Sequence, residues 1–79
     1  MSKPETNGKR RGFVPKLHAR PAMSFVDVTQ KRIEKIAYAW DEIDPSMSRA
    51  CDDLAAALRV FARDLDSSIE VMNEPADQD

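Results

Sequence analysis

The chain has 79 residues, a formal net charge of −2 at pH 7 and a 42% share of hydrophobic residues, which together allow one small domain. With one cysteine and one histidine, a single copy has neither an intramolecular disulfide nor a zinc site built from the usual Cys and His ligands. No stretch approaches the roughly 18 apolar residues of a membrane span, so we expect a soluble protein of the cytoplasm with no membrane partner. A chain this small buries too little apolar surface to be stable by its core alone. Since a disulfide and a zinc site are excluded, we expect stabilisation by association with another copy or with a partner protein.

The first 20 residues are strongly basic, because they hold six Lys or Arg and one acidic residue. The rest of the chain holds six Lys or Arg and thirteen acidic residues. Because residues 1–21 are rich in Pro and Gly and poor in apolar side chains, we expect them to form an arm that is disordered in isolation. Such an arm suits three roles: neutralising nucleic-acid phosphates, docking in a groove of a partner protein, or keeping the chain in solution. The candidate contact residues are Lys9, Arg10, Arg11, Phe13, Val14, Lys16, Leu17, His18 and Arg20.

A heptad pattern begins after Ser24, which is a suitable N-cap residue. Apolar or small residues recur every seven positions in two interleaved rows, Val26, Ile33 and Trp40 in one and Thr29, Ile36 and Ile43 in the other. The spacing predicts a helix over about 25–43. The segment SFVDVT also alternates in hydrophobicity, so a short strand near 22–29 is the alternative.

A second helix is predicted from Pro45, because Asp44 is a good N-cap and proline is favoured at the first helical position. Its rows are Cys51, Leu58, Leu65 and Met72, and Met47, Leu54, Phe61 and Ser68. The pattern supports a helix over about 45–66 or longer. The last residues, 73–79, are polar and acidic, and we expect a disordered tail.

Two helices joined by a few residues run antiparallel, so the sequence predicts an all-α hairpin domain over residues 22–72. One hairpin leaves apolar side chains in water, and we expect it to dimerise into a four-helix bundle or to dock on a partner protein. The candidate core and interface residues are Ile33, Ile36, Trp40, Ile43, Leu54, Leu58, Phe61 and Leu65.

Chemistry-bearing residues are sparse. The two glycines, Gly8 and Gly12, do not make a phosphate-binding loop, and His18 has no nucleophile or orienting partner at a recognisable spacing. Cys51 falls in a heptad row, where it serves as a small core residue. We therefore expect no enzymatic activity, no cofactor, no metal and no small-molecule substrate.

The strand alternative leads to another function. Strand, helix, turn and helix is an order that resembles the ribbon-helix-helix repressors, whose dimers place a two-stranded ribbon in the DNA major groove. The resemblance implies a DNA-binding repressor or nucleic-acid accessory factor. The favoured expectation is a small regulatory or adaptor protein that binds a partner protein, or itself, through the apolar face of the hairpin, with the arm as a second contact.

Overall fold

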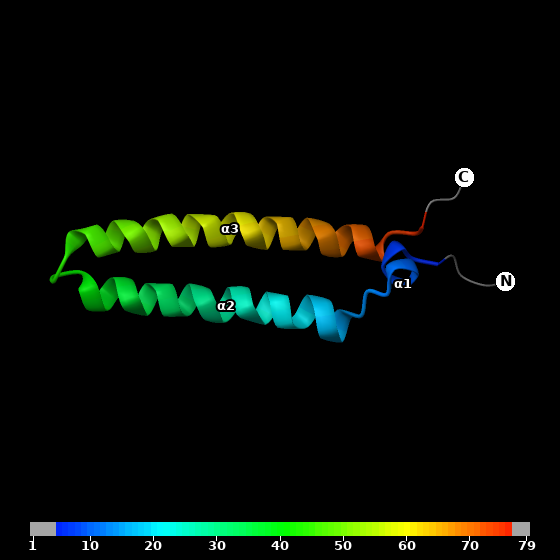
Figure 1. Cartoon of the computed structure of the whole chain (residues 1–79), viewed down its shortest axis with the longest axis horizontal. Coiled ribbons are helices and arrows are strands. Elements are labelled where there is room, and N and C mark those ends of the chain that lie inside the picture. Colours follow the sequence, from blue (N-terminus) through cyan, green and yellow to red (C-terminus); the bar gives the residue numbers. More distant parts are fainter. Residues whose placement is uncertain (1–4, 77–79) are drawn as a thin grey trace.

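The computed structural model describes residues 5–76, which form three helices: α1 (Asn7–Arg11), α2 (Pro15–Trp40) and α3 (Pro45–Asn73). The long helices α2 and α3 lie side by side and antiparallel, with the turn at one tip and α1 at the other (Figure 1). The predicted helical hairpin is therefore confirmed. Four residues of the predicted arm, 1–4, and three of the predicted tail, 77–79, lie outside the described residues.

The first long helix begins at Pro15, well before the predicted start near Phe25, and ends at Trp40 instead of Ile43. Val14 has an extended backbone and Pro15 follows it at the first helical position, which proline favours. Pro21 lies inside the helix, although its lack of an N–H leaves one backbone hydrogen bond unmade. Residues 15–21 are thus helical, and the disordered arm is not confirmed.

The strand expected near residues 22–29 as an alternative is wrong, because that whole segment is helical. Within residues 5–76 the only β-type pairing is an isolated bridge between Thr6 and Pro75. A helix there extends the seven-residue row of Val26 and Ile33 backwards to Ala19, which is buried. Burial of this continuous row outweighs the local alternation of SFVDVT.

The second long helix starts where the sequence predicts, at Pro45. The Asp44 Oδ1 atom accepts hydrogen bonds from the Ser46 hydroxyl at 2.8 Å and from the Ser46 backbone N–H at 3.0 Å. These bonds lower the pKa of the Asp44 carboxyl below its usual value. The helix continues to Asn73, so it takes the longer of the two predicted lengths.

The core between α2 and α3 is small. Ile33, Cys51 and Leu58 are buried, and Val26, Ala37 and Ala55 pack against them. The second heptad row of α3 is not the predicted one: the half-buried row is Ser48, Ala55, Ala62 and Ile69. Three members of this row, Ser48, Ala55 and Ala62, have small side chains, which suit the close approach of two packed helices.

The N-terminal segment is tied to the end of α3. The Asn7 N–H donates to the Glu74 carbonyl at 2.9 Å, and the Ala76 N–H donates to the Glu5 carbonyl at 2.7 Å. Gly8 is buried in this contact, where an added Cβ would lie 2.8 Å from the Met72 carbonyl oxygen. Residues 5–12, predicted as part of the arm, thus pack on the hairpin.

The hairpin is one layer thick, with extents of 64 × 22 × 14 Å. Its radius of gyration is 18.0 Å, against about 12 Å for a compact domain of this length. It exposes 6613 Å², whereas a compact monomer of 8.9 kDa would expose about 4,800 Å². Both flat sides of the layer therefore meet solvent. None of the described helices is long and apolar enough to cross a membrane.

Candidate functional site

Phe25 of α2 and Phe61 of α3 lie on the same side of the hairpin, since their rings pack edge to face with centroids 6.1 Å apart. This contact identifies that side on each helix, because residues three, four or seven positions apart share one face. Each ring remains about half exposed. The pair therefore marks an open surface.

Apolar residues continue along this side of both helices, after Phe25 in α2 and before Phe61 in α3. We call this surface the apolar face; it consists of Phe25, Val28, Ile36, Ala39, Ile43, Met47, Ala50, Leu54, Ala57 and Phe61. All of them are exposed except Met47, which is half-buried. Leu54, near the middle of α3, is 54% exposed, and Ile43 at the turn is 72% exposed. A contiguous apolar surface of this kind on a soluble chain marks an interaction site.

Few charges interrupt the apolar face. Arg32 lies within it, seven residues after Phe25, and Lys35 lies at its outer edge, seven residues after Val28. On α3, Asp53 flanks the face one position before Leu54. The cations thus lie on α2, and this acid lies on α3.

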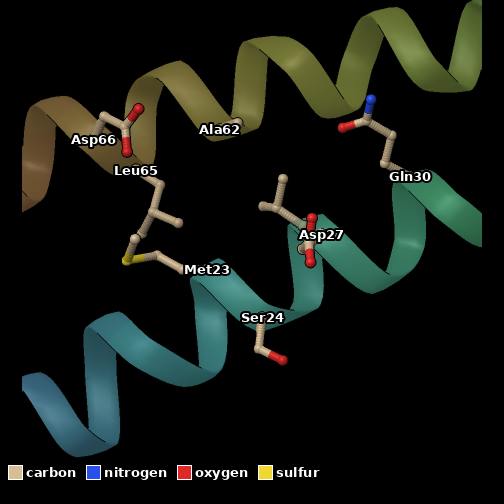
Figure 2. A pocket seen from close by; sticks show the side chains of 8 residues that line it. Met23, Ser24, Asp27, Gln30, Ala62, Leu65 and Asp66 are labelled. Carbon is tan, nitrogen blue, oxygen red and sulfur yellow. The ribbon is translucent and has the colours of Figure 1, made fainter.

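The opposite side of the hairpin, which we call the polar side because charged residues stand at its groove, carries an open groove of about 550 Å³ lined by both apolar and polar side chains. Its lining includes Met23, Asp27 and Gln30 from α2 and Ala62, Leu65 and Asp66 from α3. Met23 and Leu65 point toward each other across it, with Asp27 and Asp66 at its rim (Figure 2). Asp27 pairs with Lys31 at 3.6 Å, one turn along the same helix. The two sides of the layer therefore differ in chemistry.

The predicted core and interface residues divide into two groups. Ile33 and Leu58 are buried and Leu65 is half-buried, so these three pack inside the hairpin. The other five are exposed; they are Ile36, Trp40, Ile43, Leu54 and Phe61. Four of these five belong to the apolar face. Trp40 lies beside it, at the last turn of α2 and 39% exposed.

The predicted arm residues gather at the tip opposite the turn. Lys9, Arg10 and Arg11 form the last turn of α1, next to its left-handed Gly12 cap at φ 79°. Val14 caps α2, and Lys16, Leu17, His18 and Arg20 lie in its first turns. Leu17 is 70% exposed. The structure thus places these residues at one tip, in α1 and the start of α2, except Phe13 and Val14, which lie in the link between the two helices.

His18 is held by its neighbours. The Val14 N–H donates to Nδ1 of His18 at 2.9 Å, and the His18 ring stacks on Phe13 with centroids 5.6 Å apart. Cys51 is buried in the core, as its heptad position indicates. Among residues 5–76 no three His, Cys, Asp or Glu side chains form a group that could hold a metal ion.

Sequence reasoning missed Phe25 and Val28 as members of the apolar face. The signal was available, because both precede Ile36 at helical spacing once residues 15–25 are taken as helix. The contact of Gly8 with Met72 has no comparable signal, since the two residues lie far apart in the chain.

Comparison with known proteins gives no relative. No family model matches the chain, and neither a curated protein nor a solved structure is significantly similar to it.

Proposed function

We propose that this chain is a small, non-enzymatic regulatory or adaptor protein that works by protein–protein association through the apolar face. The observation that carries the proposal is the one-sided distribution of apolar residues around Phe25 and Phe61 on a hairpin one layer thick. A hairpin that only had to fold alone would gain nothing from apolar residues on its outer side.

The free energy gained by covering the apolar face supports its role as an interface. Covering about 500 Å² of such surface would stabilise an association by about 12 kcal/mol before its entropic cost. That gain exceeds what the small core of Ile33, Cys51 and Leu58 leaves to a lone hairpin. Association with a second copy, giving a four-helix bundle, and docking on a different protein are the two forms the function takes.

The basic tip forms a second contact in this proposal. Lys9, Arg10, Arg11 and Leu17 are all exposed at this tip, so the tip offers both cations and an apolar side chain. This combination suits an acidic segment of a partner. A DNA-binding ribbon is not proposed, because residues 22–29 are helical.

Site-specific photo-crosslinking tests the proposed surface. A photoreactive amino acid replaces Leu54 on the apolar face or Arg59, which lines the polar side of the same helix. Irradiation of cells that make the full chain is expected to give protein adducts from position 54 and few from position 59, because only the first position lies in an interface.

Phe61→Glu in the chain that carries the probe at position 54 is expected to abolish the adducts, since a charge beside the probe opposes burial. Adducts from both positions alike, or from neither, would contradict the proposal.

A further inference from the structure

We propose that the apolar face is covered by the apolar face of a second copy of this chain, related to the first by a twofold axis along the length of the hairpin. In this arrangement Arg32 and Lys35 of each copy lie beside Asp53 of the other. The inference rests on the proposed function and names its partner.

The axial register of the hairpin supports the match. The contact of Phe25 with Phe61 shows that these two residues lie at the same level along the hairpin, and counting from that level toward the turn places Ala39 level with Met47. Rotation about an axis along the hairpin leaves the position of each residue along that axis unchanged and swaps the sides on which the two helices lie. Helix α2 of one copy therefore lies over α3 of the other. Phe25 then lies over Phe61 of the second copy, and Ala39 over Met47 of the second copy. Apolar side chains meet apolar side chains at both ends of the face.

Charge complementarity selects this axis over the other possible one. Counting from the Phe25–Phe61 level, Arg32 lies level with the turn of α3 that contains Leu54. The twofold axis along the hairpin therefore brings Arg32 close to Asp53 of the second copy. A twofold axis across the hairpin would instead bring Arg32 beside Arg32 of the second copy, a like-charge contact that is unfavourable.

The exposed area is large enough for an interface of ordinary size. One chain exposes 6613 Å², about 1,800 Å² more than a compact monomer of its mass. A standard protein–protein interface buries about 800 Å² on each partner, which is less than this excess. Stacking two layers also encloses Leu54 and Phe61, which one layer leaves open.

The two ends of the hairpin are the main opposing contribution, since this arrangement brings both copies of Asp41, Glu42 and Asp44 to one end and both copies of Lys9, Arg10 and Arg11 to the other. These side chains are exposed, and their repulsion is screened beyond about 8 Å at physiological ionic strength.

Sedimentation equilibrium of the full chain tests the inference, with circular dichroism to check that each variant keeps its helices. The wild type is expected to sediment as twice 8.9 kDa. Leu54→Lys is expected to sediment as a monomer, whereas the matched variant Gln30→Lys, on the polar side, keeps the dimer.

A charge exchange tests the axis. Arg32→Asp and Asp53→Arg are each expected to weaken the dimer by about tenfold, and the double variant to recover most of that loss. Failure of the double variant to recover would overturn the arrangement.

If the wild type stays monomeric at about 100 µM, the apolar face is not covered by a second copy of this chain. In that case adducts of a different protein at position 54 would still leave the proposed function standing, whereas the absence of adducts would remove both.

Discussion

Phe25 and Phe61 pack edge to face across the two long helices, with ring planes at 81°, while about half of each ring stays exposed. Such a pair contributes beyond the area that it buries, because the positive edge of one ring meets the negative face of the other. The contact therefore helps to hold α2 and α3 together and also shapes the open surface.

A double-mutant cycle measures the contribution of this pair. Phe25→Leu, Phe61→Leu and the double variant, compared by urea unfolding at one protein concentration, are expected to give a coupling energy of about 1 kcal/mol. The control cycle pairs Phe25→Leu with Tyr38→Leu, since Tyr38 is 87% exposed. Equal couplings in the two cycles would show that the rings do not interact.

Gly8 tests the attachment of the N-terminal segment to α3. An alanine there would bring its Cβ to 2.8 Å from the Met72 carbonyl oxygen, so Gly8→Ala is expected to separate α1 from α3. Amide hydrogen exchange should then become faster in residues 5–12 while Ile33 and Leu58 keep their protection. Lys9→Ala, an exposed position of the same helix, is the control and should leave exchange unchanged. Protection of residues 5–12 in Gly8→Ala would disprove the close contact.

Pro21 lies within α2 and leaves one helical hydrogen bond unmade. Pro21→Ala is therefore expected to stabilise the chain, by up to about 3 kcal/mol in urea unfolding. Pro15→Ala should change stability much less, because proline suits the first helical position. A loss of stability in Pro21→Ala would mean that residues 15–21 are not helical in solution.

Asp44 gives the stability a pH dependence. Its pKa in the folded chain is lowered from 3.8 by the hydrogen bonds from Ser46, so its stabilising effect is full above about pH 4 and is lost as the pH falls through the folded pKa. Asn is also a good N-cap but does not titrate. The melting temperature of wild type minus that of Asp44→Asn should therefore fall as the pH is lowered from 7 to 2. A difference independent of pH would contradict the capping role of the carboxylate.

The start of α3 could be predicted from the sequence because its signals are local: Asp44 caps and Pro45 begins the helix. The hairpin itself could be predicted from the heptad rows through Ile33 and Leu58, both of which are buried. Here short-range chemistry and long-range packing agree.

The start of α2 and the surface of α3 could not be predicted in the same way. Pro21 indicates a helix break by its local chemistry, yet the buried row that begins at Ala19 holds the segment in the helix. In α3 the larger Leu54 and Phe61 suggest a core row, whereas the smaller Ala55 and Ala62 lie closer to α2. The size of the gap between two helices decides this choice, and one helix alone does not reveal it.

The bonds that join Asn7 to Glu74 and Glu5 to Ala76 also determine how the chain responds to force. A pull that separates residues 5 and 76 acts at one tip and breaks these two bonds before it reaches the α2–α3 core. The contacts then open one after another, as in a zipper, so each step opposes the pull with only a few interactions. A pull between that tip and the turn instead acts along both helices and loads their whole packed length at once.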